Sequence, residues 1–201
     1  PYLDKYTDEI DADPKEAAEI AMWIHENADE IMANGCRLSE RELEAAKAMY
    51  DAEIRYTDEC IGRLFEYVQS LDRDIVFIVT ADHGELFGEH GLLAHRVVVT
   101  DPVTHVPLVV HGFDEIADAT GGVAQHVGLS ATLVAQVGGE TETLHGVDLR
   151  SERREGAISQ RGPEDFEVYL DRNPEFDTSR YHSSLLTGYR TLEYRFQTSD
   201  D

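Results

Sequence analysis

The chain has 201 residues, of which 41% are hydrophobic, and its 41 acidic and 17 basic side chains give a formal net charge of −24. This hydrophobic content suffices for the core of one globular domain or a large part of one. The negative charge makes nucleic acid and anionic membrane unfavourable partners. No apolar run approaches the roughly 18 residues of a membrane span, so we expect no membrane-spanning segment.

The acidic surplus is typical of adaptation to salt. At molar salt the Debye length falls to roughly 3 Å, which screens repulsion between carboxylates. We therefore expect a halophilic protein and favour the cytoplasm of a salt-adapted organism, with an ordinary acidic protein as the alternative. Cys36 and Cys60 have no metal-binding spacing, and we expect them to be reduced and structural.

Two amphipathic helices are predicted in the first third of the chain. Asp13, Pro14 and Glu16 provide an N-cap, a proline at the first helical position and a carboxylate three residues after the cap, and helical spacing continues to residues 34–35. Residues 39–42 then carry a capping box, and the second helix is predicted to run to about residue 71. Its expected apolar stripe consists of Leu43, Ala46, Tyr50, Ile54, Ile61, Leu64, Phe65 and Val68.

Two short apolar runs follow, at residues 75–80 (IVFIVT) and 106–110. Continuous β-branched runs of this length are typical of strands buried in a parallel sheet. Pro107 is expected at the start or edge of its strand because it cannot donate to the ladder. A helix is predicted over residues 127–137, closed by two glycines.

Beyond residue 149 the chain is rich in turns and charges. Strands are predicted near residues 166–170 and within 183–196, where Leu192, Tyr194 and Phe196 alternate as in a half-buried antiparallel strand. The whole order predicts an α/β fold with a mainly parallel sheet flanked by helices and a small antiparallel C-terminal portion.

A polar loop, TADHGELFGEHG at residues 80–91, follows the first apolar run. Ligand groups collect where strands of an α/β sheet end, and a carboxylate beside an imidazole is a natural pair of metal ligands. Asp82 and His83 hold that position, although such a pair also occurs as a cap or a hydrogen-bonded turn. The glycines and histidines that follow, up to His95, favour a functional loop.

These residues resemble the sulfatase branch of the alkaline-phosphatase superfamily. The similarity covers residues 43–149 and rests on ordered segments: MYDAEIRYTDECIGRLFEYV, TADHGELFGEHGLLAH, THVPLVVHG, LSATLVAQVGG and LHGVDL. The resemblance implies that residues 1–201 form a single partial sulfatase-like domain, incomplete by the family's standard, with a strand-rich portion at 150–201.

The resemblance also implies roles for single residues. Asp82 and His83 would be half of a divalent-cation site, with Ca²⁺ favoured by the family, while imidazole suits Mn²⁺ or Zn²⁺ better than Ca²⁺. His95 would be a catalytic and substrate-binding residue, or else a solvated surface residue. His90 would contact substrate, or else only the loop backbone.

Other polar residues are expected to be structural. We assign no chemistry to Glu85 and Glu89, and His105 is expected to be structural. The remaining histidines, including His126, have no partner at a suitable spacing.

The family's nucleophile is a formylglycine made in a C/S-x-P-S-R motif, and neither GCRLSER at Cys36 nor ECIGR at Cys60 fits it. We expect the formylglycine and a further aspartate pair in a part of the enzyme that precedes these residues, so the fragment alone is expected to be inactive.

The implied function is metal-dependent hydrolysis of a small-molecule sulfate ester. A phosphate or phosphonate ester hydrolase of the same superfamily is one alternative. A non-catalytic relative whose acidic face binds a partner or hydrated cations is another. The sequence identifies neither the particular ester nor the oligomeric state.

Overall fold

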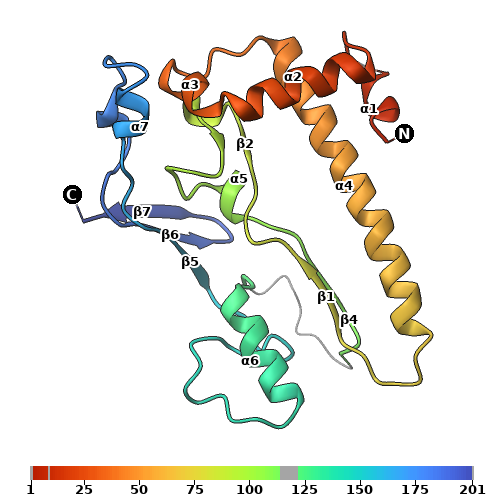
Figure 1. The fold of residues 1–201 in the computed structure, drawn as a ribbon. Helices are drawn as coiled ribbons and strands as arrows, with labels where there is room; N and C mark the ends of the chain where they lie inside the picture. Colours follow the sequence, from red (N-terminus) through yellow and green to blue (C-terminus); the bar gives the residue numbers. More distant parts are fainter. Residues whose placement is uncertain (1, 9, 114–121, 201) are drawn as a thin grey trace. The chain divides into compact units, whose positions relative to one another are not determined.

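The computed structural model describes residues 2–8, 10–113 and 122–200. Figure 1 shows the helices and strands of these residues. They form two compact units, and each unit is built from three separate stretches of the chain. Unit 1 comprises Pro1–Ile75, Ala81–Arg96 and Asp165–Tyr181, and unit 2 comprises Val76–Thr80, Val97–Glu164 and His182–Asp201. The assignment of residues 1–201 to one partial domain stays a prediction.

Unit 1 is mainly helical. Its elements are α1 (Asp4–Thr7), α2 (Pro14–Glu26), α3 (Ala28–Ala33), α4 (Glu40–Gln69), β2 (Leu86–Phe87), η1 (Glu89–Gly91), β3 (Leu93–Ala94), α7 (Glu167–Leu170) and η3 (Thr178–Arg180).

The N-cap predicted at Asp13 is confirmed. Its carboxylate accepts hydrogen bonds of 2.9 Å from the backbone N–H groups of Lys15 and Glu16. The single helix expected up to residue 34 is instead divided at Asn27, whose φ of −111° and ψ of 16° leave the helical region. The Asn27 side chain donates to the carbonyl of Trp23 at 2.8 Å, which gives the chain a local alternative to the helical hydrogen bonds.

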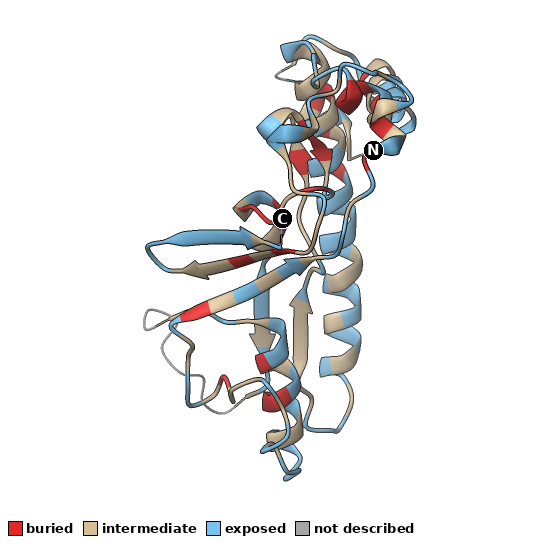
Figure 2. Cartoon of the chain, turned by 90° about the vertical axis from the view of Figure 1, so that its left-hand side faces the viewer, coloured by how far each residue is buried: buried red, intermediate tan, exposed pale blue. Residues whose placement is uncertain are grey.

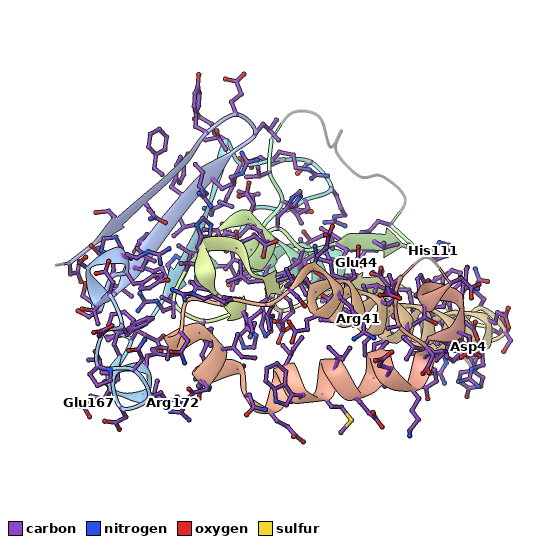
Figure 3. All side chains as sticks on the ribbon, turned by 90° about the horizontal axis from the view of Figure 1, so that it is seen from above. Asp4, Arg41, Glu44, His111, Glu167 and Arg172 are labelled. Atoms are coloured by element: carbon purple, nitrogen blue, oxygen red, sulfur yellow. The ribbon has the colours of Figure 1, made fainter. Side chains whose placement is uncertain are left out.

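The capping box at the start of α4 is confirmed, with Ser39 and Glu42 each bonding the other's backbone N–H. Arg41, labelled in Figure 3, fastens this end of the helix: its Nη2 lies 2.5 Å from Glu16 Oε1, and its Nε donates to the carbonyl of Asp11 at 2.6 Å. Local capping and an ion pair therefore set where α4 begins and how it meets α2.

The predicted stripe of α4 is wrong for several of its residues. The buried positions of α4 are the small residues Ala45, Ala48 and Ala52, whereas Ile54 and Leu64 are each 52% exposed. Figure 2 shows most of α4 in the colours of exposed and intermediate residues. Alanines allow close approach of a neighbouring helix, so the contact lies on the alanine face, and periodicity alone does not show which face is covered.

The strand predicted near residues 166–170 is wrong, because this segment forms the short helix α7. Phe166 and Tyr169, three positions apart, are both buried in unit 1. The rings of Tyr169 and Phe176 lie 5.1 Å apart, and Asn173 donates to the carbonyl of Ala33 at 2.9 Å. An apolar pair at i and i+3 fits one helical turn, and too few residues were present for the period to be recognised.

Unit 2 contains the remaining strands. Its elements are β1 (Phe77–Thr80), α5 (Asp101–Thr104), β4 (Leu108–His111), α6 (His126–Gln136), β5 (Gly156–Arg161), β6 (Leu186–Thr191) and β7 (Arg195–Ser199).

The strands β1 and β4 correspond to the two apolar runs, but they pair antiparallel, from Phe77 opposite His111 to Thr80 opposite Leu108. Contrary to the prediction, these strands are not buried, and Val109 is 59% exposed. All four strand pairs within the described residues are antiparallel, so the prediction of a mainly parallel sheet is wrong for them. Apolar composition indicates an extended segment. It determines neither the direction of the partner strand nor which neighbours bury the segment. Pro107 directly precedes β4, as predicted.

The predicted antiparallel C-terminal portion is confirmed as the sheet β5–β6–β7. β5 itself was not predicted. Leu192 and Tyr194 do not belong to a strand, because a turn follows β6 in which Thr191 Oγ1 accepts from the backbone N–H of Glu193 and Tyr194. Side-chain bonding by Thr191 thus overrides the alternating pattern.

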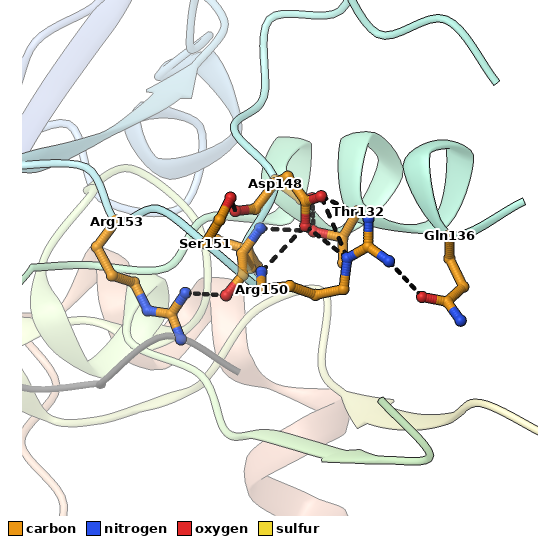
Figure 4. Close-up of polar contacts among 8 residues, drawn as sticks. Thr132, Gln136, Asp148, Arg150, Ser151 and Arg153 are labelled. Atoms are coloured by element: carbon orange, nitrogen blue, oxygen red, sulfur yellow. Dashed lines mark hydrogen bonds and ion pairs between the residues drawn. The ribbon is translucent and has the colours of Figure 1, made fainter. Parts of the chain in front are cut away.

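The helix expected over residues 127–137 is confirmed as α6. Figure 4 shows how the segment after it is fastened: Arg150 donates to both carboxylate oxygens of Asp148 and to Gln136 Oε1 of α6. The buried Thr132 accepts the backbone N–H of Leu149 at 2.8 Å. These contacts hold the segment at residues 148–150 against α6. None of the helices in the described part of the chain has both the length and the apolar character that crossing a membrane requires.

Candidate functional site

The polar loop forms a small antiparallel hairpin in unit 1. Leu86 pairs with Ala94 and Phe87 with Leu93. The hairpin is anchored by leucines that are almost fully buried, with Leu86, Leu92 and Leu93 exposed by 2%, 0% and 5%. The polar loop is therefore held in place by its own apolar residues.

Left-handed backbone conformations shape the turn of this hairpin. Gly88 has φ of 104° and Gly91 has φ of 76°, which glycine adopts without steric cost. The backbone N–H of Gly88 donates to the carbonyl of Leu92 at 2.9 Å. Glu89 Oε2 accepts the N–H of Phe87 at 2.5 Å, which agrees with the expected structural role of Glu89.

His90 lies at the tip of the turn, with φ of 60°. Its carbonyl accepts hydrogen bonds from Arg180 Nη2 at 3.2 Å and from the Tyr181 hydroxyl at 3.0 Å, while the residue itself is exposed. The paired strands separate His90 from Asp82, His83 and His95. A backbone role is therefore visible for His90, and its binding of substrate stays a prediction.

Asp82 and His83 lie together at the open end of the hairpin. Asp82 Oδ1 accepts the backbone N–H of His83 at 3.0 Å, and Asp82 Oδ2 lies 3.6 Å from His83 Nε2. The first contact holds the pKa of the Asp82 carboxyl below its usual value. An ionised carboxylate oxygen and a ring nitrogen thus lie 3.6 Å apart, close enough to be ligands of the same metal ion.

The tautomer of His83 follows from its second contact. His83 Nδ1 lies 3.1 Å from the carbonyl oxygen of Gly84. A carbonyl can only accept, so Nδ1 carries a proton in this contact, and in the neutral imidazole Nε2 keeps a lone pair beside Asp82. Metal-binding histidines are typically fixed in this way, with one ring nitrogen donating to a backbone carbonyl or carboxylate. The donor set fits half of a divalent-cation site.

His95 joins this group across the hairpin. Its ring stacks on that of His83, with centroids 3.7 Å apart and planes inclined by 27°. His95 Nδ1 lies 3.1 Å from Glu85 Oε1, and the same oxygen is 3.9 Å from His83 Nδ1. The structure therefore brings together Asp82, His83 and His95 and adds Glu85, while the roles of these residues stay predictions.

His83, Glu85 and His95 also meet the spacing of a metal-binding group, since one ligand atom from each lies within 4.8 Å of the others. The hydrogen bond from His83 Nδ1 to Gly84 argues against use of that nitrogen as a ligand, because a protonated nitrogen has no lone pair to offer. The Nε2 side of His83, which faces Asp82, remains the better place for an ion.

Glu85 was expected to carry no chemistry. The available signal was its position in the hairpin: Leu86 and Ala94 form the last pair of the ladder, and Glu85 and His95 are the next residues beyond it. Recognising that signal requires the register, which two-residue strands do not reveal by periodicity. His126 was likewise left without a partner, and its Nε2 lies 3.1 Å from Thr80 Oγ1 in unit 2.

The sulfatase family profile matches residues 2–139, a range that contains all of these site residues. The chain belongs to the Sulfatase family. This confirms the resemblance drawn from the D-H-G-E loop and its flanking segments. The family is generally metal-dependent, which agrees with the donor pair at Asp82 and His83.

Known relatives share part of their length with this sulfatase-family chain. It is 30% identical over 113 residues to the multifunctional alkaline phosphatase superfamily protein PehA of Trinickia caryophylli, covering 54% of the chain and 22% of PehA. It is 26% identical over 88 residues to the uncharacterized sulfatase YidJ of Escherichia coli, covering 43% of the chain and 18% of YidJ. The chain thus spans about a fifth of these relatives.

Solved structures show the same fold. The phosphonate monoester hydrolase SpPMH from Silicibacter pomeroyi is similar with a TM-score of 0.59 and 20% identity, over 80% of this chain and 34% of that one. BT4656, solved in complex with its substrate D-glucosamine-2-N,6-O-disulfate, gives a TM-score of 0.57 and 19% identity, over 87% of this chain and 37% of that one. The helices and small sheets described above are therefore part of an alkaline-phosphatase-like fold.

Proposed function

We propose that the natural protein hydrolyses small-molecule sulfate esters in a metal-dependent reaction. The observation that carries the proposal is the pairing of Asp82 Oδ2 with the free Nε2 of His83 at 3.6 Å, with the other nitrogen of His83 bonded to Gly84. Family membership supports the same conclusion, since Asp82 and His83 match the family's D-H-G-E motif.

Asp82 and His83 would hold a divalent cation, which when bound draws charge from an ester oxygen and so makes the sulfur or phosphorus atom easier to attack. Asp82 supplies an ionised oxygen and His83 a lone pair in a fixed tautomer. An oxygen and an imidazole nitrogen together leave Ca²⁺, Mn²⁺ and Zn²⁺ as candidates. The formylglycine nucleophile of the resemblance is not among these residues.

His95 would act on the leaving group. Its Nδ1 is occupied by Glu85, so its Nε2 is the nitrogen available to the substrate. In the charged form, Nε2–H would stabilise the negative charge that grows on the ester oxygen, or give it the proton.

A phosphate or phosphonate ester is the second candidate substrate. It is favoured by the similarity to PehA, which is named as multifunctional, and by the fold shared with a phosphonate monoester hydrolase. The pair Asp82 and His83 does not distinguish sulfur from phosphorus, because both esters present anionic oxygens to the cation.

The test uses the protein as its gene encodes it, stripped of metal by a chelator and reloaded with Ca²⁺, Mn²⁺ or Zn²⁺. Turnover of matched aryl sulfate, aryl phosphate and aryl phosphonate substrates is then compared for the natural protein and for Asp82→Ala. Asp51→Ala, which removes an exposed carboxylate of α4, is the control.

We expect metal-dependent turnover that Asp82→Ala abolishes and Asp51→Ala leaves unchanged. Higher kcat/KM for the sulfate supports the leading proposal, and higher kcat/KM for phosphate or phosphonate supports the second candidate. Turnover that persists in Asp82→Ala would remove this carboxylate from the site.

A further inference from the structure

We propose that Glu85 is a positioning residue for His95, fixing the tautomer and ring orientation with which His95 meets the leaving group. The inference rests on the proposed function. It gives a role to Glu85, for which the neighbouring residues in the sequence indicate no role. It follows from three features of the hairpin: its register, the polar contacts of Glu85 with histidine and the stacking of the two imidazoles.

The register of the hairpin places Glu85 opposite His95. Leu86 pairs with Ala94, so the residues one step outward on each strand are Glu85 and His95. Side chains alternate along a strand, and Leu86 is turned into the core, so Glu85 points to the opposite face. The 3.1 Å contact between Glu85 Oε1 and His95 Nδ1 is therefore built into the backbone.

His95 is held by its backbone as well. The preceding residue, Ala94, has φ of 59°, a left-handed conformation that costs a non-glycine residue roughly 1 kcal/mol or more. Burial of the adjacent Leu93 stabilises the strand in this conformation. The result aims the His95 ring back across the hairpin at Glu85.

The contacts of Glu85 are confined to imidazoles. Within the described residues its carboxylate has ion-pair contacts to His95 at 3.1 Å and to His83 at 3.9 Å, with no arginine or lysine within that range. His83 Nδ1 already donates to Gly84, so the short contact belongs to His95. A half-buried carboxylate reserved for a histidine is better explained by positioning than by a surface ion pair.

The tautomer follows from the acceptor. An ionised carboxylate can only accept, so His95 donates through Nδ1–H and leaves Nε2 for the substrate. The stacked ring of His83 limits rotation of the His95 ring out of this plane. Without Glu85, the imidazole could turn or protonate on the other nitrogen, and the group facing the substrate would change.

The proton balance of the step is complete with water as the second reactant. The bond between sulfur or phosphorus and the ester oxygen breaks, and its electron pair leaves with that oxygen. The oxygen takes the proton of His95 Nε2–H and departs as an alcohol. The oxygen that replaces it comes, over the whole cycle, from water, whose proton returns to His95. Glu85 takes no part in the proton transfer and keeps its bond to Nδ1–H.

The test compares Glu85→Ala, Glu85→Gln, His95→Ala and the double variant Glu85→Ala/His95→Ala in the metal-loaded natural protein. Glu66→Gln, an exposed carboxylate of α4, is the control. Each protein is assayed with esters whose leaving alcohols range from acidic nitrophenols to weakly acidic alkyl alcohols. Proton transfer matters most for the poor leaving groups, so a role through His95 predicts a dependence on the alcohol.

For poor leaving groups, Glu85→Ala is expected to lower kcat by about 10- to 100-fold with little change in KM. For nitrophenol esters the loss should be small. Glu85→Gln keeps an oxygen that can accept the Nδ1–H bond, so it should recover part of the rate. The double variant should be no slower than His95→Ala, because both changes remove one interaction.

A second readout does not depend on turnover. Nitrogen–proton correlation spectra of the His95 ring should show a proton on Nδ1 in the natural protein and its loss or transfer in Glu85→Ala. An unchanged ring spectrum, or equal rate losses for all leaving groups, overturns the role of Glu85. If Asp82→Ala and His95→Ala slow the reaction but Glu85→Ala does not, the positioning role fails while the proposed function survives; absence of any metal-dependent turnover by the natural protein overturns both.

Discussion

The hairpin at residues 86–94 and the strand pair β1–β4 reverse the expectation from their sequences. The hairpin lies in a stretch rich in charge and glycine, yet its leucines are almost fully buried. The strands β1 and β4 are continuous apolar runs, yet their residues are exposed or intermediate in the structure. Burial thus depends on which neighbours an element meets, and a few leucines with a defined turn can be better anchored than a longer apolar strand.

The difference also agrees with the place of the candidate site, at the open end of the hairpin. Side chains that hold a cation or position a histidine need a backbone that does not move, and the buried leucines supply it. The short strands leave their polar residues on the opposite face. The following five predictions, made on four variants, test whether the hairpin is the rigid region and β1–β4 the tolerant one, from the largest expected effect to the smallest.

Removing the most buried anchor of the hairpin should have the largest effect. Leu92→Ala is expected to lower the free energy of unfolding by about 2–5 kcal/mol, because it leaves a cavity where a side chain is 0% exposed. Urea unfolding followed by circular dichroism measures the change. A loss below about 1 kcal/mol would show that the hairpin is not anchored through this residue.

Changing the turn should have the next largest effect. Gly91→Ala is expected to cost about 1–2 kcal/mol, since φ of 76° is unfavourable for any residue with a Cβ. Its Cβ would meet Arg180 and Tyr181 no closer than 3.7 Å, so crowding should add little. Gly62→Ala, at a helical position of α4 with open space around it, is the matched control and should be neutral or stabilising.

Loss of the hydroxyl that bonds to His90 should cost less. Tyr181→Phe is expected to lower the free energy of unfolding by about 0.5–1.5 kcal/mol, because the carbonyl of His90 keeps its bond to Arg180. Hydrogen exchange should quicken at Gly91 and Leu92 but not in α6. Equal exchange throughout unit 1 would contradict a role for this hydroxyl in fixing the turn.

The same variant should alter the alkaline limit of stability. Burial raises the pKa of Tyr181, so the unfolded chain loses this proton at a lower pH than the folded protein. The contribution of the neutral phenol is complete below about pH 10, the ordinary tyrosine value, and is lost as the pH rises through the folded pKa. Unfolding at pH 8 and above pH 10 should therefore show a smaller alkaline loss in Tyr181→Phe than in the natural protein.

The smallest effect is expected on β4. Val109→Thr should change the free energy of unfolding by no more than about 0.5 kcal/mol, because the residue is largely exposed and both side chains favour strands. Measuring it beside Leu92→Ala gives the comparison directly. A loss as large as that of Leu92→Ala would mean that β4 is covered in the natural protein.

The sequence by itself determined the features that depend on near neighbours. The cap at Asp13 and the capping box at residues 39–42 were predicted correctly, because each requires only side chains within three residues of the backbone groups they satisfy. The Asp82–His83 pair and its family were likewise recognisable, since the D-H-G-E motif and its flanking segments are contiguous and ordered along the chain.

Only the tertiary structure decided the features that depend on distant partners. The contact of Glu85 with His95 spans ten residues and exists because the hairpin register places them opposite each other. The antiparallel direction of β1 and β4, and the burial of alanines instead of larger residues on α4, likewise depend on what each segment packs against. Local hydrogen bonds depend on adjacent residues, whereas strand register and burial depend on the free energy of the whole folded chain.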